Sequence, residues 1–213
     1  MSSEFRVVMS GPLADPFNLL LDIRDVLASR LSFDSMADAF IETEVEADDV
    51  NREGLRLPFQ PPSRALAAGC TSASSGFTGS GIILDVFIEI PRKQFVNVSV
   101  EISDRGLVDA FRNKTLTTYY SALALIATSC RAVGAAGDLD FYPDPIAPEA
   151  IVATIINNPW NHGYPTDVGI IPSSVMPQQA VTEFAGDAFR VEKRLSYWLL
   201  VGHDFERLLR EWP

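Results

Sequence analysis

Few side chains in this sequence could act as nucleophiles or bases. Its 213 residues contain two cysteines, Cys70 and Cys130, and two histidines, His162 and His203. A cysteine hydrolase would need one of these thiols beside an imidazole, with a carboxylate to orient the ring. Cys130 falls on the apolar stripe of a predicted helix, where cysteine is usually inert. Cys70 is therefore the one candidate nucleophile, and no catalytic signature surrounds it.

The sequence also gives no clear signal for a metal site or a phosphate-binding site. The available ligands, His162, Asp167, His203 and Asp204, do not recur at a ligand spacing such as HxxxH or CxxC. The glycine-rich run at 76–81 precedes a strand, so it lacks the helix N-terminus that would hold a phosphate. No serine stands in a Gly-x-Ser-x-Gly turn. We therefore predict no catalytic residue, no metal and no cofactor.

Carboxylates are the reactive groups that the sequence concentrates. The segment 34–53 contains eight acidic residues and one basic residue. A strand predicted over 39–46 places Glu42, Glu44 and Glu46 on one face, about 7 Å apart. Carboxylates this close repel one another, so two interpretations remain. The row is either the solvated face of an edge strand, or a docking stripe for a basic partner.

A second candidate contact surface lies in the loop predicted over 157–166. This segment is rich in turn-forming residues and carries Trp160 and Tyr164. Aromatic side chains in loops often supply much of the binding energy of an interface. The alternative is that Trp160 packs back onto the core, since tryptophan is largely buried on average.

The overall charge narrows the class of partner. The formal net charge is −11 and the isoelectric point is about 4.6. An acidic surface repels nucleic-acid phosphates and anionic lipids, so we expect neither nucleic acid nor membrane as a partner. Two widely spaced cysteines without a secretory signal indicate free thiols in a reducing compartment. We therefore expect a cytoplasmic protein.

The elements that must position these groups are organised around residues 82–102. Apolar β-branched residues alternate with polar ones in both arms of this segment, which predicts a β-hairpin with a turn at Pro91. A helix predicted over 115–133 has apolar residues at every third and fourth position. We expect this helix to cover the apolar face of the hairpin, because each needs a partner layer.

The rest of the chain predicts an alternation of helices and strands. Asp15 and Pro16 favour a helix start, as N-cap and first helical residue. The small and turn-forming residues of 57–81 predict a long loop. Strands are predicted over 5–9, 139–142, 168–171 and 188–201, the last in the centre of the sheet, and helices over 148–156, 177–185 and 203–212.

Together these elements predict an α+β fold with a mixed, mostly antiparallel sheet and a central β-hairpin covered by helices on one face. We expect a single domain over 1–213, with the proline-rich run at 143–148 as the candidate for a boundary within it.

Two functional hypotheses follow. The favoured one is an acidic cytoplasmic protein that neutralises a basic protein partner, most concretely a bacterial toxin-immunity (antitoxin-like) protein that blocks a toxin active site. The alternative is a small-ligand-binding protein or hydrolase with a pocket near the 57–81 loop, where Cys70, His162 and His203 would converge. A structural subunit with a merely soluble acidic face is a third possibility. The residues predicted to bind the partner are Glu42, Glu44, Glu46, Asp48, Asp49, Trp160 and Tyr164.

Overall fold

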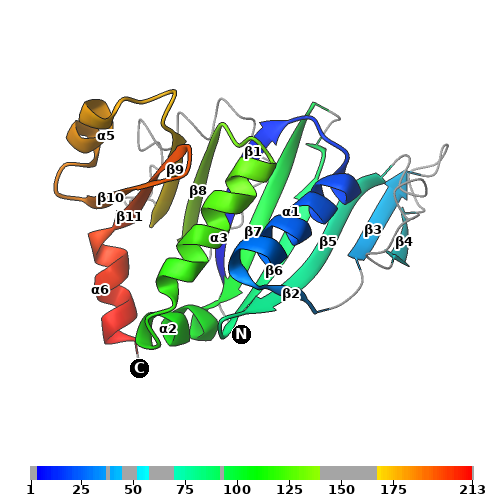
Figure 1. Ribbon diagram of the computed structural model, residues 1–213, viewed down its shortest axis with the longest axis horizontal. Coiled ribbons are helices and arrows are strands. Elements are labelled where there is room, and N and C mark those ends of the chain that lie inside the picture. The colour runs from blue at the N-terminus through cyan, green and yellow to red at the C-terminus, as the bar shows by residue number, and fades with distance from the viewer. Residues whose placement is uncertain are drawn as a thin grey trace.

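The computed structural model describes residues 4–36, 39–44, 52–57, 70–91, 94–139 and 167–212; at 43–44, 52–57 and 138–139 it describes the backbone alone. These residues form eleven strands and five helices (Figure 1). The strands are β1 (Glu4–Pro12), β2 (Asp34–Ser35), β3 (Ala39–Glu44), β4 (Arg52–Leu57), β5 (Cys70–Gly79), β6 (Ile82–Glu89), β7 (Phe95–Ser103), β8 (Gly134–Leu139), β9 (Val168–Pro172), β10 (Phe189–Arg194) and β11 (Tyr197–Gly202). The helices are α1 (Pro16–Leu31), α2 (Asp104–Arg112), α3 (Leu116–Ser129), α5 (Gln178–Ala185) and α6 (His203–Glu211).

All described strands join one sheet. Its order is β10-β11-β9-β8-β1-β7-β6-β5-β3-β4, and the short β2 pairs with β5. Every pairing between described strands is antiparallel. The α+β class and the mostly antiparallel sheet are therefore confirmed.

The predicted hairpin lies in the middle of the sheet. β6 and β7 pair with Val86 opposite Val100. Burial alternates strictly along β6, from buried Ile82 to exposed Glu89, as the period-two pattern requires. Helices cover its apolar face, as expected, but α1 and α2 approach it most closely. The helix predicted over 115–133 is shorter, and as α3 it packs beside α1.

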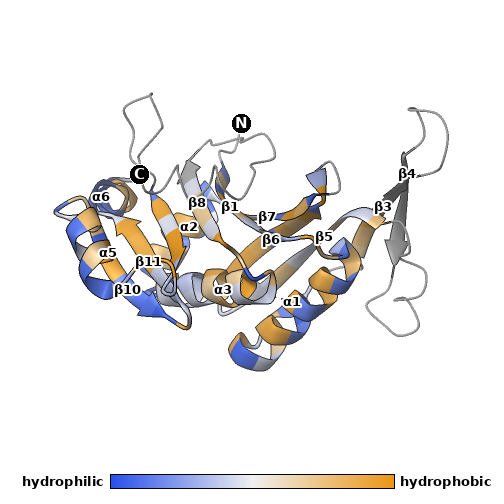
Figure 2. Cartoon of the chain, turned by 90° about the horizontal axis from the view of Figure 1, so that it is seen from above, coloured by the Kyte–Doolittle hydropathy of each residue, from blue (hydrophilic) through white to orange (hydrophobic). Residues whose placement is uncertain are grey.

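One large core fills the space between the sheet and its helices. α1 begins where predicted, because the Asp15 side chain accepts a hydrogen bond from the Asn18 backbone N–H at 2.8 Å. Apolar side chains of α1, α2, α3 and α6 meet the same sheet face. The Phe5 ring of β1 stacks on Phe205 of α6 and meets Tyr119 of α3 edge to face. Viewed from above, the sheet curves past α1 and α3 (Figure 2).

The opposite sheet face is covered at one end by α5. Val181 of α5 packs with Trp198 and Leu200 of β11 and Ile171 of β9 in a second, smaller cluster. Strands β3, β5 and β6 lie at the other end of the sheet from α5 (Figure 1). The candidate site is built on the side of these strands that faces away from the main core and its described helices.

The long loop predicted over 57–81 is wrong in its second half. Residues 70–79 form β5, which pairs with β3 on one side and β6 on the other. Ala73 and Phe77 of this strand are buried in the main core. Ser80 and Gly81 both have positive φ, 53° and 77°, and make the two-residue turn into β6. The small residues of 70–79 therefore form a strand, and this strand is held in place by its pairing with β3 and β6.

The single final strand predicted over 188–201 is also wrong. Leu195 has a φ of 53°, and the chain turns there so that β10 and β11 form a hairpin at the edge of the sheet. β11 is apolar on both faces for a reason other than a central position in the sheet. Leu199 faces the main core, whereas Trp198 faces the cluster beneath α5.

Other predictions differ in detail. The helix α2, capped by Ser103 at the Gly106 N–H, was not predicted. The strand predicted over 139–142 shares only Leu139 with β8, which begins earlier, at Gly134; residues 140–142 lie outside the described residues. The strand predicted over 168–171 and the helices predicted over 177–185 and 203–212 are confirmed as β9, α5 and α6. The helix predicted over 148–156 and the boundary candidate at 143–148 lie outside the described residues.

Candidate binding face

The predicted partner-binding residues are only partly within the described residues. Glu42 lies in β3, half-buried and opposite in direction to the buried Ile41, as the alternation predicted. Glu44 ends the same strand, and its backbone alone is described. The remaining predicted residues, Glu46, Asp48, Asp49, Trp160 and Tyr164, lie outside the described residues. The strand itself is not an edge strand, since β4 pairs with its outer side.

The structure argues against Cys70 as a nucleophile. Its side chain is part of the core, and its thiol donates a hydrogen bond to the Ser72 carbonyl at 3.0 Å. Burial, with a contribution from the charge of Asp15, raises the pKa of the Cys70 thiol to about 11, so the reactive thiolate is disfavoured. Burial likewise raises the pKa of Cys130 to about 12.

The structure does not bring Cys70 and His203 together. Cys70 begins β5, whereas His203 begins α6 beside β11, at the other end of the sheet (Figure 1). His162, the third member of the predicted convergence, lies outside the described residues. The predicted pocket near 57–81 is therefore not built around a pairing of these two groups.

A different set of side chains meets on the side of β3, β5, β6 and β7 that faces away from the described helices α1 and α2. We call this surface the open face. It comprises Phe40 and Glu42 of β3, Ser72 and Ser74 of β5, Asp85, Phe87 and Glu89 of β6, and Ser99 and Glu101 of β7. Part of it is exposed: Phe40 keeps 41% of its surface accessible and Phe87 keeps 44%. Two partly exposed aromatic side chains therefore stand on this face.

The antiparallel register sorts these residues into cross-strand rows. Glu42, Ser72 and Glu89 stand opposite one another in the first row. The next row holds Phe40, Ser74, Phe87 and Ser99. A third row places Asp85 opposite Glu101, which in turn stands opposite Arg6 of β1. An aromatic row thus runs between two acidic rows.

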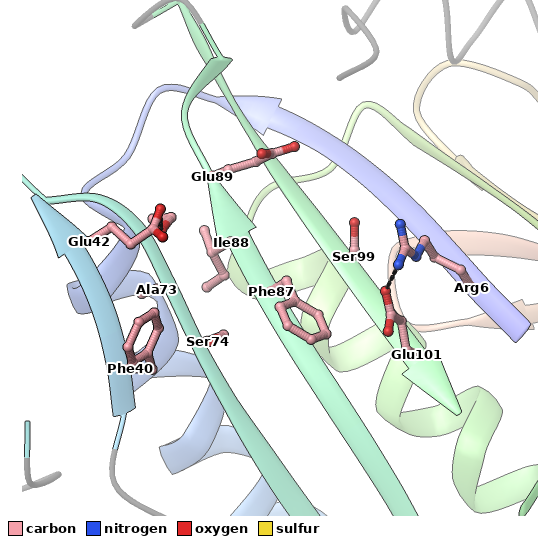
Figure 3. A pocket seen from close by; sticks show the side chains of 11 residues that line it. Arg6, Phe40, Glu42, Ala73, Ser74, Phe87, Ile88, Glu89, Ser99 and Glu101 are labelled. Carbon is pink, nitrogen blue, oxygen red and sulfur yellow. Dashed lines mark hydrogen bonds and ion pairs between the residues drawn. The ribbon is translucent and has the colours of Figure 1, made fainter. Parts of the chain in front are cut away.

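The small side chains of β5 leave a depression between the larger side chains of β3 and β6. We call it the serine trough: its floor is Ser72 and Ser74, its walls are Phe40 with Glu42 and Phe87 with Glu89. Figure 3 shows Phe40 and Phe87 on either side of Ser74. The cavity has a volume of about 410 Å³ and extends to Ser99, Glu101 and Arg6 on its far side.

The carboxylates of the open face differ in their surroundings. Glu42 accepts a hydrogen bond from the Ser72 hydroxyl at 3.0 Å. Glu101 is buried and forms an ion pair with Arg6. Burial raises the pKa of Glu101 to about 7, with Arg6 opposing the rise and the nearby Glu4 adding to it. Partial burial and Glu4 also raise the pKa of Asp85.

Sequence reasoning found the acidic strand but missed the aromatic row and the carboxylates of β6. The alternation in the hairpin did place Asp85, Phe87 and Glu89 on its outer face. What was missing was β5, which joins this face to Phe40 and Glu42. A phenylalanine at a position that alternation assigns to solvent was the signal that could have directed attention to Phe87.

No family model, curated protein or solved structure matches the chain. Within the described residues, no three histidine, cysteine or acidic side chains gather in a way that could hold a metal ion. Among the helices that the structure describes, none is both long enough and apolar enough to cross a membrane.

Proposed function

We propose that this chain is a binding protein whose open face recognises a basic protein partner. The single observation that carries the proposal is the pair of exposed phenylalanines, Phe40 and Phe87, set between carboxylates on a sheet face that α1, α2, α3 and α6 leave open. The phenylalanines offer apolar area that contributes to affinity, and the carboxylates offer negative charge that selects a basic partner.

The aromatic side chains distinguish this proposal from an acidic face that serves solubility alone. Charge is sufficient for solubility, whereas exposed Phe40 and Phe87 leave apolar surface in water at a cost in free energy. Burying such rings in a partner recovers that free energy, and aromatic residues often dominate the affinity of interfaces. The open face is thus better suited to contact than to solvation.

The carboxylates determine the sign of the charge that the partner must carry. Glu42, Asp85 and Glu89 border the aromatic row, and the whole chain carries a net charge of −11. A basic partner would be steered toward this face and would associate faster at low ionic strength. An acidic partner would be repelled by the same groups.

A toxin-immunity protein of the bacterial cytoplasm is the most concrete role of this kind. Such a protein covers the active site of a cationic toxin, and this role adds one requirement to binding: the partner must be harmful when produced alone. The described residues support this role through the open face and through the burial of Cys70, which disfavours nucleophilic catalysis there.

The test begins with capture of partners from the native host with the full chain as bait. A captured basic protein is then purified, and its dissociation constant is measured by calorimetry in increasing salt. The face variant Glu42→Gln/Asp85→Asn/Glu89→Gln removes three charges from the open face. The matched control Glu183→Gln/Asp187→Asn/Glu211→Gln removes three exposed charges from α5, α6 and the turn after α5.

We expect the face variant to weaken binding at least tenfold and to flatten the salt dependence, with the control variant unchanged within about twofold. Equal losses in both variants would mean that net charge, rather than the open face, governs binding, and would overturn the proposal. Toxicity of the purified partner in cells, relieved by co-expression of this chain, would establish the immunity role; a harmless partner would exclude it.

A further inference from the structure

The sheet ends at β10, and no described strand pairs with the outer side of β10. The ladder with β11 shows which backbone groups face outward. The His203 N–H donates to the Ala188 carbonyl at 3.0 Å, where β10 begins. Hydrogen bonds to one neighbour alternate along an antiparallel strand. Phe189, Val191 and Lys193 therefore direct their backbone N–H and C=O groups away from β11.

The charged side chains of β10 are held within the chain. Edge strands commonly avoid association by projecting charged side chains, lysine above all, beyond the sheet. Lys193 is the one exposed side chain of β10, and its Nζ lies 5.4 Å from the Trp198 ring centroid, over the neighbouring strand β11. Arg190 forms ion pairs with Glu192 and with Glu206 of α6. These charges therefore offer little protection against the approach of another strand.

The apolar side of β10 is incompletely covered. Phe189 and Val191 pack against the cluster beneath α5 but remain only partly buried. Phe184 of α5, which is also partly buried, stacks on Phe189 with the ring centroids 6.5 Å apart. The cluster thus reaches the end of the sheet with apolar surface still in water, and a strand added at this edge would bury it.

We propose that β10 pairs with β10 of a second copy of this chain, antiparallel and about a two-fold axis at Val191. In this register Val191 faces its own counterpart, and Phe189 faces Lys193 of the second copy, so the outward backbone groups of both strands are hydrogen-bonded. The clusters beneath the two copies of α5 then meet across the axis. This interface goes beyond the proposed function and does not depend on it.

The charges of β10 select this register. With the axis at Val191, Arg190 stands opposite Glu192 of the second copy, and symmetry repeats the pair. Opposite charges directly across two strands stabilise their pairing, and like charges oppose it. Moving the axis one residue earlier would set Arg190 opposite itself, and moving it one residue later would set Glu192 opposite itself. A second copy supplies the complementary pattern by symmetry, whereas an unrelated strand would have to match it in sequence.

Pairing through β10 leaves the open face accessible. β10 and the strands β3, β5 and β6 lie at opposite ends of the sheet (Figure 1). A dimer of this kind joins the two sheets into one and carries an open face toward each end.

The first test is sedimentation equilibrium of the unmodified full chain, at about 0.15 M salt so that the net charge of −11 on each copy is screened. We expect the mass to rise with concentration from 23.4 kDa toward twice that value. Hydrogen exchange should show protection that increases with concentration at the amides of Phe189, Val191 and Lys193. A chain that stays monomeric up to about 1 mM would overturn the proposal.

Charge reversal tests the register. Arg190→Glu sets two carboxylates opposite each other at both symmetric sites, and Glu192→Arg does the same with two guanidiniums. Each variant alone should dimerise at least tenfold more weakly than the wild type. An equimolar mixture of the two variants restores opposite charges at both sites, so it should form a heterodimer about as strong as the wild-type dimer. Recovery in the mixture would also show that both variants are folded.

Arg105→Glu is the matched control, because it reverses a fully exposed charge on α2, away from β10. It should change the dimerisation constant less than about twofold. Dimers that persist in both single variants, or folded variants whose mixture does not recover, would mean that another surface makes the contact and would overturn the proposal. If either variant fails to fold, hydrogen exchange of the wild type decides, since protection confined to other strands would have the same meaning.

Discussion

The hydroxyl of Tyr119 offers a sharp test of the core. Tyr119 lies in α3 and is fully buried between the rings of Phe5 and Tyr120. Its hydroxyl has no hydrogen-bond partner in the part of the chain that the structure describes, and burial raises the pKa of this phenol well above its usual value. Tyr197 of β11 is the matched case, because its buried hydroxyl donates a hydrogen bond to the Ala127 carbonyl at 3.0 Å.

The two tyrosines should therefore respond in opposite directions to the same change. Tyr119→Phe removes a polar group that is buried without a partner, which should stabilise the fold by about 1 kcal/mol. Tyr197→Phe removes a satisfied hydrogen bond and should destabilise the fold by about 1 kcal/mol. The loss stays modest because the Ala127 carbonyl also accepts the Ala132 N–H at 2.8 Å. The difference between the variants is about 2 kcal/mol.

Urea unfolding followed by circular dichroism measures this difference directly. In thermal unfolding of a chain of this size, the same difference of about 2 kcal/mol in the free energy of unfolding corresponds to about 4 to 8 °C between the melting temperatures of the two variants. A Tyr119→Phe variant that is less stable than the wild type by 1 kcal/mol or more would show that the hydroxyl is satisfied in solution. A Tyr197→Phe variant as stable as the wild type would refute the value assigned to its hydrogen bond.

Three other predictions follow from the packing and the titrating groups. Gly11→Ala would place a Cβ 2.1 Å from the Cys130 carbonyl oxygen, so we expect a loss of more than about 3 kcal/mol in urea unfolding. Because the folded pKa of Glu101 is about 7 against an ordinary value of 4.5, the folded state binds more protons between these values. The stability that this protonation contributes is fully present below about pH 4.5 and is lost as the pH rises through about 7, which lowers the free energy of unfolding by at most about 3 kcal/mol. Urea unfolding of Glu101→Gln across this pH range should show no such decrease. Cys70 and Cys130 should react with Ellman's reagent far more slowly in the folded chain than in denaturant, and fast labelling of either would contradict their burial.

Elements with strong local signals could be predicted from the sequence. The hairpin of β6 and β7 alternates with a period of two, so its buried face follows from the sequence alone. The start of α1 was equally clear, since Asp15 and Pro16 are the residue types that favour a helix N-terminus. In both cases the information lies within a few neighbouring residues.

Elements stabilised by distant contacts could not be predicted in this way. β5 has few apolar residues, and it is a strand because β3 and β6 supply hydrogen bonds on both sides and α1 covers it. Gly79 shows how close that packing is, since a Cβ there would lie 2.7 Å from the Phe33 ring. The split of β10 from β11 depends on Leu195, a residue type that rarely adopts positive φ.

The residues that concealed β5 are the ones that give the open face its shape. Ser72, Ser74 and Gly76 carry almost no apolar surface, so they resemble a loop in sequence. Within the sheet, the same small side chains leave room between Phe40 and Phe87. Larger β-branched residues at these positions would strengthen the strand but would fill the trough. The weak strand signal and the cavity therefore have one physical origin, which explains why the candidate site lies where sequence-based prediction was poorest.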